Sequence, residues 1–248
     1  EGFELRRAPT AVADLRDDVA VRNTYYDEVR ALVRQATGAA DAIVFDHTIR
    51  ETGRTNLNAI GQDAGAAAVV PRVHSDYTDD GAPRRFRDVV ASGAYAGPRL
   101  SEAELTHYER GALGDPVGGR IAFINVWRNA DGSSPVLRQP LAVCDGRSVS
   151  PTEHFRYEMV YASRRGANYS LEAKNSHRWF YYPGMEQAEA LLFKVFDGDR
   201  GQGARYVFHA AFEDPTTPEG APPRTSIEVR TIALFGPWPE GPEGAGNG

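Results

Sequence analysis

The stretch Val73-His74-Ser75-Asp76-Tyr77 is the part of this sequence that most directly predicts both the fold and the site. A short apolar run precedes it and the turn-forming Asp79-Asp80-Gly81 follows it, so we expect a strand over residues 67–77. Side chains at positions i and i+2 of a strand point to the same face, and His74 and Asp76 should therefore project together. An imidazole and a carboxylate at this spacing are two of the three ligands of a 2-His-1-carboxylate site, which binds Fe(II).

Composition narrows the classes of partner. The 248 residues are 41% hydrophobic, which is enough to bury the core of one barrel or sandwich domain. A net charge of −6 argues against a nucleic-acid partner, and no apolar run in the sequence reaches membrane-spanning length. Cys144 is the only cysteine, which excludes an intrachain disulfide and a cysteine-based metal site. A single cysteine also fits a reducing, cytoplasmic location.

Short apolar segments separated by turn residues recur along the chain and predict a mainly β protein with flanking helices. Apolar residues at helical spacing predict a helix over 23–36 that ends at Gly38, and a second, short helix that begins at Met185. Residues 51–66 read as a loop. The remaining predicted strands are 42–45, 120–128, 141–143, 157–162, 168–174, 177–182, 190–196, 204–212 and 225–235.

The same pattern predicts one domain over residues 1–248. We expect a helical and strand region over 1–50 and a β core over 51–235. The last segment, 236–248, is rich in Gly and Pro, which predicts a flexible tail.

A third ligand and an anion anchor are predicted near the end of the chain. His209 shares a strand face with Val207 and Ala211, whose small side chains leave room around a metal. After a Pro- and Gly-rich loop, Arg224 and Ser226 begin the last predicted strand and share one face of it. A guanidinium and a hydroxyl at this spacing suit a carboxylate, because Arg offers two parallel donors and Ser adds a third.

The order His-x-Asp, a distant His and then Arg-x-Ser resembles the Fe(II)/2-oxoglutarate-dependent oxygenases, whose fold is a double-stranded β-helix, a cupin-like jelly roll. Longer stretches are similar to one hydroxylase/desaturase family of these enzymes, which includes the cephamycin-pathway hydroxylase component. The resemblance covers roughly residues 40–235. The stretches that carry it are HSDYTDDGAPRR (74–85), NVWRN (125–129), PLAVCDGRSV (140–149), HRWFYYPGM (177–185), LLFKVFD (191–197) and FHAAFEDPTTPEGAPPRTSIEVR (208–230).

The resemblance implies a set of cofactors and roles. Fe(II) would be bound by His74, Asp76 and His209. Arg224 would pair with the distal carboxylate of the co-substrate 2-oxoglutarate, and Ser226 would support it. O₂ would be the third reactant, and a small natural-product intermediate would be hydroxylated, desaturated or oxidatively cyclised.

His177 is the rival for the third ligand. It shares a predicted strand face with Trp179 and Tyr181, and Lys194 would then anchor the co-substrate. We favour His209, because only His209 is followed by Arg-x-Ser. In that case His177 either contacts substrate in the pocket or is a structural histidine.

Four further residues are weaker candidates. Asn125 and Trp127 share a strand face, where the amide suits a contact with the co-substrate and the indole a contact with the substrate; core packing explains both equally well. Tyr181 is a second candidate for the co-substrate. Arg50 follows a strand and either reaches the substrate pocket or lies in a surface turn.

Two other functions remain open from the sequence. A cupin-like metal-dependent dioxygenase or isomerase that does not use 2-oxoglutarate would employ Arg224 and Ser226 to hold its substrate. A non-catalytic barrel would bind a small acid. In every case the expected ligand is a small molecule, with no nucleic acid and no membrane, and either a homodimer or a pathway partner protein is compatible with the sequence.

Overall fold

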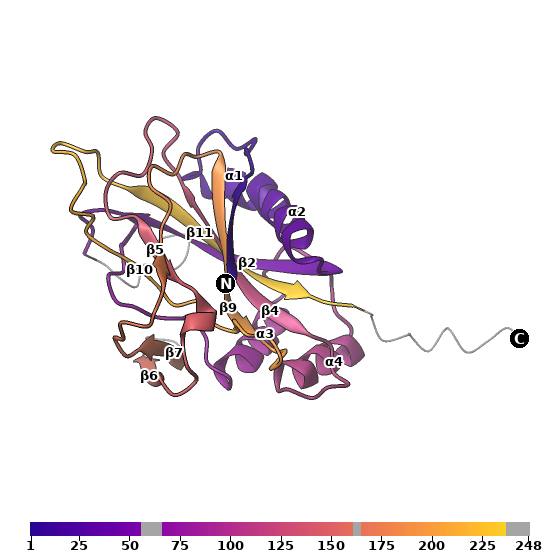
Figure 1. Ribbon diagram of the computed structural model, residues 1–248. Helices are drawn as coiled ribbons and strands as arrows, with labels where there is room; N and C mark the ends of the chain where they lie inside the picture. Colours follow the sequence, from indigo (N-terminus) through magenta and orange to yellow (C-terminus); the bar gives the residue numbers. More distant parts are fainter. Residues whose placement is uncertain (56–65, 161–164, 237–248) are drawn as a thin grey trace, which may run out of the picture.

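The structure is a computed structural model that describes residues 1–55, 66–160 and 165–236, and it consists mostly of β-strands with a few short helices (Figure 1). Three sheets are present in these ranges: a six-stranded sheet in the order β1-β9-β4-β11-β2-β3, a three-stranded sheet β10-β5-β8, and the hairpin β6-β7. The strands are β1 Phe3–Arg7, β2 Asp41–Glu51, β3 Ala67–Ala68, β4 Ile121–Asn129, β5 Leu141–Cys144, β6 His154–Val160, β7 Arg165–Leu171, β8 Trp179–Phe180, β9 Glu189–Asp197, β10 His209–Ala211 and β11 Thr225–Leu234.

The helices lie around the large sheet, with α2 apart from the neighbouring pair α3 and α4 (Figure 1). They are α1 Asp18–Ala20, the π-helical turn η1 Val21–Tyr25, α2 Tyr26–Thr37, α3 Gly81–Ser92, α4 Glu102–Ala112 and the 3₁₀ turn η2 Gly146–Ser148.

The helix predicted over 23–36 is confirmed and begins earlier, at Asp18, where the Asp17 side chain accepts two backbone N–H bonds. Gly38 ends it with φ 71°, a left-handed conformation that glycine adopts without strain. None of the helices in the described ranges has the length and hydropathy needed to cross a bilayer.

The large sheet has an apolar core on each face. On the outer face, α2 packs against alternate residues of β2, β4, β9 and β11, including Val44, Val126 and Val229. On the inner face, Phe123 makes ring contacts with Phe45, Tyr77 and Phe196 at centroid distances of 6.1, 4.3 and 6.0 Å. This inner core continues to β5, to residues 206–208 just before β10, and to α3 and α4, and joins the small sheet to the large one.

The strand predicted over 67–77 is wrong in its extent. Only Ala67–Ala68 forms a strand, which pairs in parallel with the end of β2. Pro71 has no N–H to donate to a ladder. Beyond it, His74 and Ser75 bridge to two different partners, His209 and Tyr169, so one regular strand cannot form.

Other predicted bounds also change. The helix predicted at Met185 is wrong, because two turns occupy residues 183–188 before β9 begins. The strand predicted over 42–45 continues to Glu51, whereas those predicted over 177–182 and 204–212 shrink to β8 and β10. Most of the predicted loop (56–65) and the predicted tail (237–248) lie outside the described residues.

The inner aromatic core generates a stability prediction. Phe123→Ala should lower the free energy of unfolding by about 3–5 kcal/mol, because a fully buried ring with three aromatic neighbours is replaced by a cavity. Val117→Ala, at a side chain that is 68% exposed, is the control and should change it by less than about 0.5 kcal/mol. Urea denaturation measures both; equal effects would contradict the packing described here.

Candidate metal centre

Backbone hydrogen bonds fix the segment His74-Ser75-Asp76 on both of its sides. His74 and His209 exchange two bonds, with N to O distances of 3.1 and 2.9 Å, and Ser75 exchanges two with Tyr169 at 2.9 and 3.1 Å. The Ser75 hydroxyl also donates to the Val195 carbonyl of β9 at 3.1 Å. The short segment therefore connects the small sheet, the β6-β7 hairpin and the large sheet.

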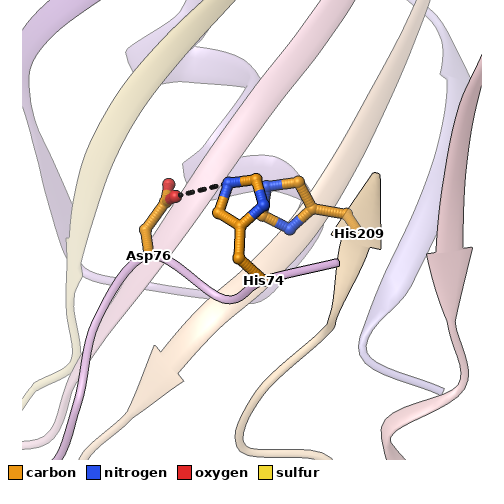
Figure 2. Close-up of side chains that lie close together, drawn as sticks. All are labelled: His74, Asp76 and His209. Atoms are coloured by element: carbon orange, nitrogen blue, oxygen red, sulfur yellow. Dashed lines mark ion pairs between the residues drawn. The ribbon is translucent and has the colours of Figure 1, made fainter. Parts of the chain in front are cut away.

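These bonds bring the three predicted ligands together. Residues that exchange two antiparallel hydrogen bonds project to the same face, and the rings of His74 and His209 lie 4.3 Å apart between centroids. His74 Nε2 is 3.4 Å from Asp76 Oδ1, and one ligand atom from each of His74, Asp76 and His209 lies within 4.8 Å of the others (Figure 2). Two imidazoles and one carboxylate in this arrangement have the composition of a facial triad for Fe(II).

The other ring nitrogen of each histidine faces a backbone carbonyl. His74 Nδ1 is 2.8 Å from the Arg72 oxygen, and His209 Nδ1 is 3.3 Å from the Val207 oxygen. A ring that donates its Nδ1–H to a carbonyl keeps the lone pair of Nε2 free for a metal. Both rings are thus oriented as metal-binding histidines usually are.

The electrostatics of the triad suit a cation. Burial, together with the positive charge of His74, lowers the pKa of His209 to about 3. Burial opposes ionisation of Asp76, but the His74 hydrogen bond and the positive charges of His209 and Arg230 outweigh it and hold the Asp76 pKa well below its usual range. A neutral His209 and an ionised Asp76 at neutral pH are protonation states that metal binding requires. Burial lowers the pKa of His74, but the hydrogen bond and the charge of Asp76 outweigh it and raise that pKa, so His74 must release its proton when a metal binds.

The second oxygen of Asp76 is held from the large sheet. Asn125 Nδ2 donates to Asp76 Oδ2 at 2.7 Å, and Arg230 Nε lies 3.8 Å from the same oxygen. Sequence reasoning placed Asn125 against the co-substrate, and the structure places its amide against a candidate ligand instead. The sequence did not predict the contact of Arg230 with the triad. The available signal was that Glu228 and Arg230 share a strand face, and the Arg230 guanidinium donates to the Glu228 carboxylate at 2.7 Å.

Arg224 and Ser226 are buried at the other end of the same surface, and both have unpaired polar atoms. Within the described residues, Arg224 makes no ion pair, and neither its Nε nor the Ser226 hydroxyl has a hydrogen-bond partner. Within the described ranges, the Arg224 side chain donates only to the Gln139 carbonyl, and its guanidinium lies over the Trp127 ring at 5.5 Å. Burial, with a further contribution from the charge of Arg50, lowers the pKa of Arg224 to about 9.

A cavity of about 570 Å³ lies beside His74 and Asp76, and its size suits a small organic molecule. Arg50 lines it, which is one of the two placements that the sequence left open, and also donates to the Ala68 carbonyl at 2.8 Å. Trp127 is buried under Arg224 and does not line this cavity. Six arginines and five acids line the wall, so no single charge sign dominates; its apolar members include Val70, Tyr77, Tyr157 and Met159.

Three sequence candidates lie outside the triad. His177 is buried, and its Nε2 is 3.1 Å from Glu153; among the described residues it belongs neither to the group formed by His74, Asp76 and His209 nor to the lining of this cavity. Lys194 forms an ion pair with Asp197 at 2.7 Å and is not available as the alternative anchor. Tyr181 is exposed and packs edge-on against Phe212, with ring centroids 5.0 Å apart, rather than facing the centre.

Comparison with known proteins gives one family and several relatives. The family model described as oxidoreductase/YMDC permease-like domain matches residues 1–234. An alpha-ketoglutarate-dependent dioxygenase, phiK, from a fungal species is 28% identical over 238 residues, covering 95% of this chain and 78% of the relative. The hydroxylase/desaturase CTB9 of Cercospora beticola is 31% identical over 252 residues, covering 94% and 70%.

A solved structure shows the fold. The iron and alpha-ketoglutarate-dependent endoperoxidase NvfI superposes with a TM-score of 0.74 at 24% identity, covering 95% of this chain and 79% of that one. At this identity the likeness applies to the fold alone.

The geometry predicts which histidine a metal needs. His209→Ala should reduce bound Co(II) or Fe(II) from one equivalent per chain to a small fraction, because one of three ligand atoms is lost. His177→Ala should keep the full equivalent, because His177 contacts Glu153 and not the triad. Anaerobic metal titration of both variants measures this. A metal-free His177→Ala beside a fully loaded His209→Ala would reverse the assignment.

Proposed function

We propose that this chain, which belongs to the oxidoreductase/YMDC permease-like domain family, is an Fe(II)- and 2-oxoglutarate-dependent oxygenase that acts on a small-molecule natural-product intermediate. Its relatives are named as alpha-ketoglutarate-dependent dioxygenases and as hydroxylase/desaturases. The hydroxylation, desaturation or cyclisation that the resemblance implied is the range of reactions we assign to it.

The observation that carries the proposal is the unpaired Arg224. A buried guanidinium with no carboxylate partner in the described ranges is expensive, since a buried charge is normally paired. An anion that arrives with the co-substrate removes this cost, and the Ser226 hydroxyl supplies one more donor. The distal carboxylate of 2-oxoglutarate has the charge and the planar shape that this pair of residues fits.

The residues of the site have separate roles in this proposal. His74, Asp76 and His209 would hold Fe(II), which when bound supplies O₂ activation coupled to decarboxylation of 2-oxoglutarate to succinate and CO₂. Arg224 and Ser226 would orient the co-substrate, and the Trp127 ring beneath Arg224 supports the guanidinium. The cavity beside His74 and Asp76 would receive the substrate, with Arg50 on its wall.

Alternative functions fit these residues less well. A metal-dependent dioxygenase or isomerase without 2-oxoglutarate would need its own substrate to neutralise Arg224. A non-catalytic barrel that binds a small acid would not explain why two histidines and a carboxylate converge on one point. The names of the relatives also favour the 2-oxoglutarate-dependent reaction.

Several finer assignments accompany this proposal. We assign the fold to the double-stranded β-helix class, because the NvfI structure superposes on 95% of the chain and the two sheets enclose the triad between them. We also propose that the chain is one domain and works in the cytoplasm. A homodimer or a pathway partner protein would be compatible with this assignment.

Reconstitution tests the function directly. Purified protein loaded anaerobically with Fe(II) should develop the weak charge-transfer absorption that 2-oxoglutarate produces at ferrous centres, and with O₂ should release succinate slowly even without substrate. Asp76→Ala should lose the absorption, because a ligand is missing. A wild-type protein that binds Fe(II) but neither shows the band nor consumes 2-oxoglutarate would favour the alternatives.

Arg224 provides a second test. Arg224→Ala should raise the dissociation constant of 2-oxoglutarate by roughly thirty-fold to several thousand-fold, which corresponds to about 2–5 kcal/mol for a lost charge-assisted pair. Iron affinity should not change, and Arg224→Lys should recover only part of the loss, because an ammonium cannot donate two parallel bonds. Titration of the charge-transfer band measures this. Binding within a factor of three of the parent would exclude Arg224 as the anchor.

A further inference from the structure

We propose that Asn125 and Arg230 are positioning residues that keep one oxygen of Asp76 off the metal, so that Asp76 ligates through Oδ1 alone. This inference rests on the proposed function, because it concerns how the Fe(II) site keeps room for the co-substrate. It gives both residues a role in the centre although neither is a ligand.

The two oxygens of Asp76 have different surroundings. Oδ1 lies 3.4 Å from His74 Nε2, on the side of the triad. Oδ2 accepts the Asn125 amide bond at 2.7 Å and lies 3.8 Å from Arg230 Nε. A carboxylate oxygen that accepts from an amide and lies near a cation is a poorer ligand than the oxygen that faces only the triad. The triad therefore presents Oδ1.

Asn125 is difficult to explain as a packing residue. It is fully buried in the centre of β4 between Ile124 and Val126, and its Oδ1 has no partner within the described residues. An unpaired buried acceptor lowers folding stability, and an aliphatic side chain would fill the same space without that cost. The bond to Asp76 is the one side-chain hydrogen bond that Asn125 makes in the described part of the chain.

Arg230 is held so that its Nε faces Asp76. Its terminal nitrogens donate to Asp46 and Thr48, both at 3.0 Å, and to Glu228 at 2.7 Å. It lies directly opposite Asn125 in the pairing of β11 with β4, so both groups approach Asp76 Oδ2 from adjacent strands. A side chain with three partners on rigid strands can hold its position when a metal binds.

The consequence is a coordination site with enough vacant positions. A metal held by three ligand atoms of a facial triad would keep open positions for the co-substrate and O₂. If Asp76 bound through both oxygens, it would compete for one of these positions. Removal of the Asn125 donor should therefore weaken 2-oxoglutarate binding without removing iron.

Asn125→Leu is the sharpest test, because it removes the donor at similar volume. We expect a full equivalent of Fe(II) and an increase of about tenfold or more in the 2-oxoglutarate dissociation constant, measured by anaerobic titration of the charge-transfer band. Arg230→Lys keeps the charge but loses the fixed geometry, and should change the same constant in the same direction. It serves as the second variant should Asn125→Leu fail to fold.

Thr231→Val is the matched control. Thr231 is buried next to Arg230 on the opposite face of β11 and donates to the Ile124 carbonyl at 2.8 Å. This variant should have a lower unfolding temperature, because a buried hydrogen bond is lost, and an unchanged dissociation constant for 2-oxoglutarate.

The outcomes separate this inference from the function itself. A 2-oxoglutarate constant within twofold of the wild type in iron-loaded Asn125→Leu would overturn the inference, and so would complete loss of iron, since Asn125 would then be needed to keep Asp76 on the metal at all. A wild-type protein without the charge-transfer band would instead overturn the proposed function.

Discussion

The two backbone hydrogen bonds between His74 and His209 are the constraint on which the site depends. They place two imidazoles on the same side of a junction, and the bonds of Ser75 to Tyr169 and Val195 prevent that junction from moving relative to the large sheet. A metal site needs its ligands positioned to within a fraction of an ångström. Here the backbone hydrogen bonds position the two histidines, and side-chain packing, such as that of Phe193 against the His209 ring, restricts the orientation of the imidazole.

Two arginines, Arg224 just before β11 and Arg230 within it, have opposite electrostatic surroundings. Arg230 has Asp46, Glu228 and Asp76 around it, and these acids raise its pKa well above the usual value although burial acts in the opposite direction. Arg224 forms no ion pair within the described ranges, and burial and the charge of Arg50 outweigh the opposing charge of Glu228 and lower its pKa to about 9. A fully compensated cation is a structural element, whereas an uncompensated one is stable only when a ligand brings the missing charge.

The stability of the fold and the chemistry of the site share the same residues. The inner core that surrounds Phe123 is continuous with Tyr77, one residue after the Asp76 carboxylate. Apolar side chains on this side of the triad lower the local dielectric constant and strengthen the electrostatic interactions of Asp76. The polar residues of the inner face, Asn125 and Arg230 among them, are therefore placed where their charges and dipoles act most strongly on Asp76.

The sequence alone determined the features that depend on local geometry. The i, i+2 spacing placed His74 with Asp76, because alternate residues of an extended chain share a face; Gly38 ended the first helix because a left-handed residue is needed there. The order of the motifs predicted His209 over His177 as the partner of the pair, and the triad contains His209.

Only the tertiary structure decided the rest, because it depends on partners that are distant in sequence. The ladder expected around His74 is replaced by single bridges to two different elements, and no local pattern reports which element will lie alongside. The same holds for side chains with several possible partners: Glu153 binds His177, Asp197 binds Lys194, Phe212 covers Tyr181, and Asp76 takes the amide of Asn125. Periodicity fixes the face on which a side chain lies, and only the packing of the sheets fixes what that face meets.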